Sequence, residues 1–292
     1  MSNFKLGRNI VVVLGLSIHL CFAQFMFCPT AFAESLNQHE TSHKSELVQK
    51  TASVDAHLTP RVFVQLRGKL HGYVTAPRLS LLVFQAGQDW YWPSAQLYKI
   101  NTEKTQQLEA SKQEVMEQLR LLTLHWHLEP QIAQQFMALR RVIAQMRIGE
   151  PIPLVLDPDA LAIRPELDKA LDIGHYVLEV HKKMDYVTFV GLGGEQKINQ
   201  QADLPAYAYL DQLPISGWRE SDEVWLVQSR AALQRSRPPL RQAIPVASWN
   251  KTPTPLPIGA LLFVPISDKY LPEPWQDLNQ RLLNLMEHRI FP

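Results

Sequence analysis

The chain has little cysteine and almost no net charge. Its 292 residues include two cysteines, Cys21 and Cys28, and 29 basic residues stand against 28 acidic ones. Both cysteines lie in an N-terminal segment that we expect to be removed, which would leave no disulfide framework and no thiol chemistry. Loss of Lys5 and Arg8 with that segment would change the formal net charge from +1 to −1. A near-neutral chain offers no electrostatic argument for nucleic acid or an anionic membrane as a partner.

Catalytic and metal-binding signatures are also missing from the sequence. It has no Gly-x-Ser-x-Gly elbow, and the glycine-rich stretch 191–194 lacks the Lys-Ser/Thr pair of a phosphate-binding loop, so we predict a turn there. His125 and His127 would lie on different faces of a predicted helix, and no third zinc ligand stands at a suitable spacing. We therefore predict no catalytic residue, no cofactor and no metal.

The first 33 residues are typical of a signal peptide. Lys5 and Arg8 precede an apolar stretch over residues 10–27, and Ala31-Phe32-Ala33 has small residues where signal peptidase needs them. An uncleaved anchor is the alternative, because the stretch is nearly long enough to span a bilayer. We expect cleavage after Ala33, export to the periplasm and no stable membrane insertion of the mature chain. Residues 34–60 are polar without apolar periodicity, which predicts a flexible leader.

Residues 61–181 predict a first α+β domain. Apolar residues alternate at 62–66, and a second short strand is expected at 70–74. A short helix from Pro77 to about Gly87 should follow. Two strands before a helix are how a β-grasp (ubiquitin-like) domain begins.

An inserted segment, 102–148, predicts a helical hairpin within this domain. Thr102 can cap the first helix, which should end near His127. Gly149 is expected just beyond the end of the second helix, which would place Arg147 on its last turn. The chain should then return to strand and turn over residues 153–159. The second helix has apolar residues spaced by three and four at Ile132, Phe136, Leu139, Ile143 and Met146.

Residues 182–267 predict a second strand-rich domain of about ubiquitin size. A short helix is expected at 203–212. Helices on one side of a mixed sheet make the fold class α+β. The expected strands lie at 185–191, 223–227, 242–248 and 260–265.

The last segment, 268–292, predicts a C-terminal amphipathic helix with Pro274 in its first turn. Its apolar face is formed by Trp275, Leu278, Leu282 and Leu285. This face either packs on its own domain or docks onto a partner protein. The polar face is not markedly basic, which argues against binding to a membrane surface.

Three neighbouring aromatic residues, Trp90, Tyr91 and Trp92, are the leading candidates for ligand binding. Flat aromatic rings stack on sugar rings, although packing in a protein core is the alternative. Period-2 alternation would place Trp90 and Trp92 on one face. Asp157 and Asp159 flank a proline, and paired carboxylates can perform glycosidase chemistry. The same Asp-Pro-Asp pattern is also ordinary in turns.

A set of short motifs, taken in order, resembles the GfcC family of capsule-biosynthesis proteins. The resemblance implies two β-grasp domains, with the helical hairpin inserted in the first, and a C-terminal amphipathic helix, similar to parts of outer-membrane polysaccharide exporters. It also implies a periplasmic role in capsule or exopolysaccharide assembly without established catalysis, with polysaccharide or outer-membrane export proteins as partners. The motifs are Trp92-Pro93, Leu156 to Asp159, Gly174 to Tyr176, Phe189 to Gly191, Trp249 to Lys251 and Leu271-Pro272.

One position departs from the family pattern. The family pattern has a Gly-Arg pair just before the Leu-Pro and Asp-Pro-Asp stretch. The resemblance implies that this arginine lines a pocket. Ungapped alignment puts Pro151 at this position. Arg140 and Arg147, both on the predicted second hairpin helix, remain as candidate binding cations, and Asp157 is a further candidate binding residue.

Three functions stay open from the sequence. The first is a non-enzymatic accessory that binds glycan or the export machinery. The second is a polysaccharide-modifying enzyme that uses Asp157 and Asp159. The third is a structural or adhesion module of the envelope that is unrelated to glycans.

Overall fold

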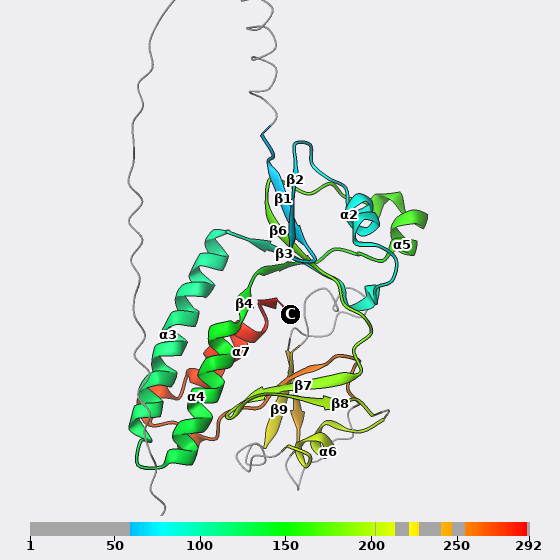
Figure 1. The fold of residues 1–292 in the computed structure, drawn as a ribbon. Helices are drawn as coiled ribbons and strands as arrows, with labels where there is room; N and C mark the ends of the chain where they lie inside the picture. Colours follow the sequence, from blue (N-terminus) through cyan, green and yellow to red (C-terminus); the bar gives the residue numbers. More distant parts are fainter. Residues whose placement is uncertain (1–58, 202, 214–221, 228–240, 247–254, 291–292) are drawn as a thin grey trace, which may run out of the picture. The chain divides into compact units, whose positions relative to one another are not determined.

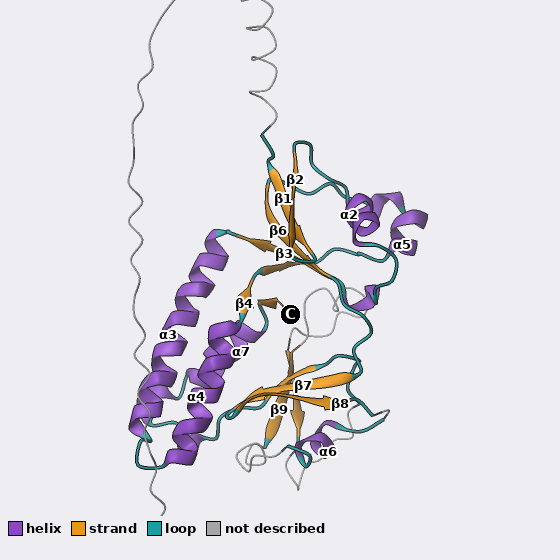
Figure 2. Ribbon diagram, viewed as in Figure 1, coloured by secondary structure: helices purple, strands orange, loops and turns teal. Residues whose placement is uncertain are grey.

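The protein is a mixed α+β structure with two separate five-stranded sheets. The computed structural model describes residues 59–201, 203–213, 222–227, 241–246 and 255–290 (Figures 1 and 2). The predicted signal peptide, nearly all of the predicted leader and the motif Trp249 to Lys251 lie outside the described residues. The α+β class predicted from the sequence is confirmed.

The first sheet has the strand order β2-β1-β6-β3-β5. Its central strands β1 and β6 run parallel, and every other neighbouring pair is antiparallel. Alternate residues of β1 are buried on one face, beneath the helix α2 (Leu79–Ala86), which ends at Gly87 with φ of 94° as predicted. The strands are β1 (Val62–Leu66), β2 (Lys69–Tyr73), β3 (Gln96–Ile100), β5 (Glu150–Ile152) and β6 (Gly174–Glu179).

The second sheet has the order β10-β9-β11-β7-β8, again with one parallel pair, β7 and β11, among antiparallel neighbours. The helix α6 (Ala206–Leu210) covers one face, where Tyr209 packs on Phe189 with ring centroids 6.2 Å apart. Strand β8 escaped the sequence analysis because Glu195 and Lys197 interrupt its apolar pattern. The strands are β7 (Tyr186–Gly191), β8 (Gly194–Asn199), β9 (Glu223–Val227), β10 (Arg241–Pro245) and β11 (Leu261–Phe263).

A long helical hairpin, α3 (Glu103–His125) and α4 (Pro130–Gln145), lies in the sequence between β3 and the later strands of the first sheet, β5 and β6. Thr102 caps α3 as predicted, because its side chain accepts from the Thr105 amide while Thr105 Oγ1 accepts from the Thr102 amide. The predicted end of the second helix was wrong. Helix α4 stops at Gln145, and the backbone of Met146 is already extended.

Arg147 therefore lies in a short strand and not on the last helical turn. This strand, β4 (Arg147–Ile148), pairs with β12 (Arg289–Ile290) near the C-terminus. Gly149 follows β4 at a point of close approach, because a Cβ there would lie 2.8 Å from Tyr98 Cβ and 2.9 Å from Ile290 Cδ1. The glycine is required by packing and does not end a helix.

The region after β5 also differs from the prediction. The strand ends at Ile152, and the expected turn at Asp157 is instead the start of a helix, α5 (Pro158–Ile163). Asp157 Oδ1 accepts from the backbone amides of Asp159 and Ala160 at 3.0 and 3.2 Å. Asp-Pro-Asp thus forms an N-cap with proline at the first helical position.

The last helix, α7 (Leu278–Met286), is shorter than predicted, since Pro274 belongs to a preceding 3-10 turn, Glu273–Trp275. Figure 1 shows α7 beside α3 and α4. Leu278, Leu282 and Leu285 are fully buried in one core shared by α7, the hairpin and the second sheet. The hairpin thus follows a strand of the first sheet in sequence, yet packs on strands of the second.

None of the helices within the described residues is both long and apolar enough to cross a membrane.

Replacing Leu282 by alanine should lower the free energy of unfolding by about 2–5 kcal/mol, because the lost side chain leaves a cavity in the shared core. Leu128→Ala is the matched control. Leu128 is 82% exposed, and the same truncation there should change stability by no more than about 0.5 kcal/mol. Denaturant unfolding of the full chain measures both, and equal losses would contradict the shared core.

Candidate functional site

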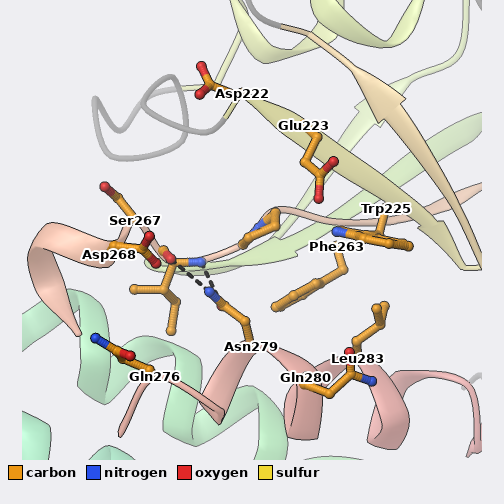
Figure 3. A pocket seen from close by; sticks show the side chains of 12 residues that line it. Asp222, Glu223, Trp225, Phe263, Ser267, Asp268, Gln276, Asn279, Gln280 and Leu283 are labelled. Atoms are coloured by element: carbon orange, nitrogen blue, oxygen red, sulfur yellow. Dashed lines mark hydrogen bonds between the residues drawn. The ribbon is translucent and has the colours of Figure 1, made fainter. Parts of the chain in front are cut away.

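A hollow of about 440 Å³ lies where strands β9 and β11 meet helix α7 (Figure 3). Pockets that hold small ligands are commonly about 300–1,000 Å³. We call it the Trp225 hollow. The residues that line it are Asp222, Glu223, Trp225, Phe263, Pro265, Ile266, Ser267, Asp268, Gln276, Asn279, Gln280 and Leu283.

The strand side of the hollow follows from period-2 alternation along β9. Val224 and Leu226 point to the core beneath α6, so Glu223 and Trp225 must point to the opposite face. Trp225 lies directly across from Phe263 of β11 in the antiparallel register. The half-buried Trp225 ring therefore gives this side its apolar surface, with the fully buried Phe263 ring behind it and the exposed Glu223 at its edge.

The helix side is held in place by Asn279. Its Nδ2 donates to the carbonyl of Ile266, and its Oδ1 accepts from the amide of Ile266, both at 2.8 Å. This pair of bonds, drawn in Figure 3, fixes α7 against the end of β11. Leu283 is buried one turn further along, while Gln276 and Gln280 are exposed beside the hollow.

These groups together suit a ligand rich in hydroxyl groups. The carboxylates of Asp222, Glu223 and Asp268 accept hydrogen bonds, and the amides of Gln276 and Gln280 both donate and accept. The Trp225 ring supplies an apolar face of the kind that packs on the C–H face of a sugar. In chemical terms the arrangement can bind and orient, and it combines contributions from two strands, a loop and a helix.

A second hollow, of about 590 Å³, lies beside the start of α3 and the end of α4. Its main cation, Lys112, is already engaged. The buried ammonium donates to the Met146 carbonyl at 2.6 Å and lies 3.6 Å from Glu109 Oε2. This cation closes the C-terminal end of α4, where it also complements the helix dipole.

The predicted aromatic cluster serves the core of the first sheet. Trp92 is buried, and Trp90 is half-buried with its Nε1 donating to the Ala86 carbonyl at 2.7 Å. Residues 92–94 form a 3-10 turn and not the strand that the alternation assumed. Tyr91 is half-buried, and its amide donates to the carbonyl of His181 at 2.8 Å. None of the three lines either of the two hollows among the described residues.

The two predicted arginines lie in different surroundings. Arg140 donates through Nε to the Met116 carbonyl at 3.3 Å, across the hairpin. Arg147 lines the second hollow, and there it donates to Gln65 Oε1 at 2.9 Å and pairs with Glu179 at 3.3 Å. Burial raises the pKa of Glu179, and the Arg147 guanidinium works against that rise. Pro151, the position aligned with the family arginine, is buried in β5.

The predicted carboxylate and helix residues are likewise committed within the chain. Asp157 caps α5, so the structure does not support the acid–base pair with Asp159. Leu278, Leu282 and Leu285 are covered by the chain itself, which is the packing alternative that the sequence left open. Trp275 is half-buried, and its ring centroid lies 5.9 Å from that of His125. A partner could reach the three leucines only if α7 left its own core.

Sequence reasoning missed the Trp225 hollow. Trp225 stood within a predicted strand. The available signal for a binding surface was that Glu223 and Trp225, two residues apart, would lie on the same face of that strand. Among the described residues, no group of three or more His, Cys, Asp or Glu side chains could hold a metal ion.

Comparison with known proteins gives two family matches that together span most of the chain. Residues 56–183 match the family described as Capsule biosynthesis GfcC, N-terminal, and residues 194–291 match the one described as Capsule biosynthesis GfcC C-terminal. The chain is also 29% identical over 157 residues to a protein named Uncharacterized protein YjbG from Escherichia coli (strain K12). That match covers 52% of this chain and 59% of the relative, which is less than two thirds of its length.

Replacing Asn279 by alanine should destabilise the protein by about 1–3 kcal/mol, because the amide and carbonyl of Ile266 both lose their partner. Asn284→Ala, on an exposed position of the same helix, is the control and should be neutral or slightly stabilising because alanine favours helix. Thermal unfolding of the two variants tests this, and similar melting temperatures would argue against the anchoring role of Asn279.

Acid should destabilise the protein in part through His181. Burial lowers the pKa of His181, so the unfolded chain takes up a proton near pH 6.5 before the folded chain does. This contribution to stability is present above the unfolded pKa and is lost as pH falls towards the lower folded pKa. The melting temperature of His181→Gln should therefore fall less than that of wild type between pH 7.5 and 5.5. This interval extends about one pH unit to either side of the ordinary histidine pKa. His127→Gln, at an exposed ring, should fall as wild type does.

Proposed function

Because this chain belongs to the capsule biosynthesis GfcC family, we propose that it is a non-catalytic accessory of capsule or exopolysaccharide assembly that binds glycan in the Trp225 hollow. The observation that carries the biological role is the pair of family matches, which account for residues 56–183 and 194–291. The hollow supplies the molecular part of the proposal.

The chemistry of the hollow supports a sugar as its ligand. A sugar presents hydroxyl groups at its edge and C–H groups on its faces. The Trp225 ring and the exposed carboxylates and amides beside it offer matching surfaces for both. Because Asn279 fixes α7 against Ile266, the two sides of the hollow are held together before the ligand arrives, which lowers the entropy cost of binding.

The place of action and the partners belong to the same proposal. Cleavage after Ala33 would deliver the mature chain to the periplasm, where polysaccharide and outer-membrane export proteins are the partners we propose. We also propose that both sheets are β-grasp units. In each sheet a parallel central pair is flanked by antiparallel strands, and this arrangement supports that assignment.

Binding without turnover is the role that we assign to the carboxylates of the hollow. They accept hydrogen bonds from hydroxyl groups and hold the glycan for the assembly machinery. Incubation of the full chain with polysaccharide from its own bacterium should therefore release no new reducing ends. Their appearance, and their loss in Glu223→Gln, would replace this proposal by an enzyme.

Truncation of Trp225 should weaken binding to that polysaccharide by about tenfold or more, because aromatic anchors at the centre of a site carry much of the affinity. Gln280→Ala should weaken binding less, through loss of one amide. Gln134→Ala, at an exposed glutamine of α4 outside the hollow, is its matched control and should bind as wild type does. Isothermal titration with the full chain measures all three. Unchanged affinity in Trp225→Ala would place the glycan elsewhere.

Deletion of the gene should reduce the polysaccharide on the cell surface, and the full-length gene should restore it. Unchanged surface polysaccharide with altered adhesion would favour an envelope module unrelated to glycans.

A further inference from the structure

The charged residues that line the Trp225 hollow, within the described part of the chain, are all acidic. Asp222 and Glu223 stand at the start of β9, and Asp268 stands across the hollow in the loop after β11. All three are exposed, and Glu223 has a further interaction within the chain. The described residues that line the hollow include no lysine and no arginine. Figure 3 shows Asp268 on a different segment from Asp222 and Glu223, and the aromatic rings between Glu223 and α7.

We infer that the hollow takes an uncharged sugar residue and rejects uronates and other acidic sugars. The inference rests on the proposed function, because it names the class of sugar for the same site. A carboxylate accepts hydrogen bonds and cannot donate them, so it pairs well with a sugar hydroxyl. We call the three carboxylates of Asp222, Glu223 and Asp268 the rim. A sugar that carries its own carboxylate or phosphate brings a like charge to this rim, and no described lysine or arginine of the lining offsets the repulsion.

The remaining groups of the hollow fit the same ligand class. Gln276 and Gln280 provide the donors that the carboxylates lack, and they can reach ring or hydroxyl oxygens without adding charge. Trp225, with the buried Phe263 opposite it on β11, provides the apolar wall. Recognition of acidic groups in proteins relies on arginine or lysine, and the two cations of the second hollow, Lys112 and Arg147, are already bonded to groups of the chain.

A metal bridge between the rim and an acidic sugar is the main competing arrangement. The described residues contain no group of three or more His, Cys, Asp or Glu side chains that could hold a metal ion by themselves. The experiment therefore runs with and without calcium, so that a bridged acidic glycan would reveal itself by binding only when calcium is present.

The test uses matched oligosaccharides that differ only at C6: glucose against glucuronate, galactose against galacturonate, and mannose against mannuronate. The full chain is titrated with each member by calorimetry at low salt. In every pair that binds, the neutral member should bind about tenfold more tightly, and added salt should narrow the difference because it screens the rim.

Asp222→Asn combined with Asp268→Asn should narrow that preference to less than about threefold, since the shape is kept and two charges are removed. Asp203→Asn, an exposed aspartate outside the hollow, is the matched control and should keep the full preference. Circular dichroism checks that each variant is folded.

Each outcome decides the inference. Neutral preference that is lost in the double variant supports it. Equal or tighter binding of the acidic member, with or without calcium, overturns it and leaves glycan binding in place. A preference that survives in the double variant also overturns it, because the rim charges would not be its cause. If no member of any pair binds, both this inference and glycan binding in the hollow are rejected.

Discussion

The packing of α7 between the helical hairpin and the second sheet is the interaction on which the rest of the structure depends. Leu278, Leu282 and Leu285 are fully buried there. They are shielded from water because α3, α4 and the strands β7, β9 and β11 all pack into the same core. The hairpin begins directly after β3 and returns to β4 and β5, so the elements that complete the second core are anchored by the first sheet. The hollow forms at the edge of this core, because α7 supplies one of its sides.

The C-terminus adds a second, polar tie. Strand β12 pairs with β4, and the carbonyl of Arg289 accepts a hydrogen bond from the buried Tyr98 hydroxyl at 3.1 Å. The Arg289 guanidinium reaches Glu195 of β8 at 2.6 Å with only 8% of its side chain exposed. A buried ion pair adds little net stability, but the loss of one partner leaves a buried charge uncompensated. Arg289 therefore makes the position of β12 specific, because its backbone carbonyl contacts Tyr98 of the first sheet and its side chain contacts Glu195 of the second.

The proposed glycan site and this packing are linked through one short stretch of chain. Ile266 is buried in the shared core, its backbone is held by Asn279, and the neighbouring Ser267 and Asp268 line the hollow. The same stretch thus contributes to stability and to the site. In a family described by capsule biosynthesis, a site of this kind would hold a sugar on a rigid platform, with specificity set by the charge at the rim and not by movement of the helix.

The sequence by itself determined the family and many of the local elements, although not β8 or α5. Alternation marked β1, the spacing of Ile132, Phe136 and Leu139 marked α4, and Thr102 marked the start of α3, because each signal is set by residues close together in the chain. Tertiary structure alone decided the rest. The sequence suggested that Gly149 ends a helix. The structure shows that a glycine is needed there because Tyr98 and Ile290 leave no room for a Cβ atom. The packing partner of the C-terminal leucines could not be decided from the sequence. An amphipathic face has the same pattern whether it packs on its own domain or on another protein. The hollow could not be foreseen, because Trp225, Asp268 and Gln280 lie far apart in sequence and meet only when the shared core brings β9, β11 and α7 together.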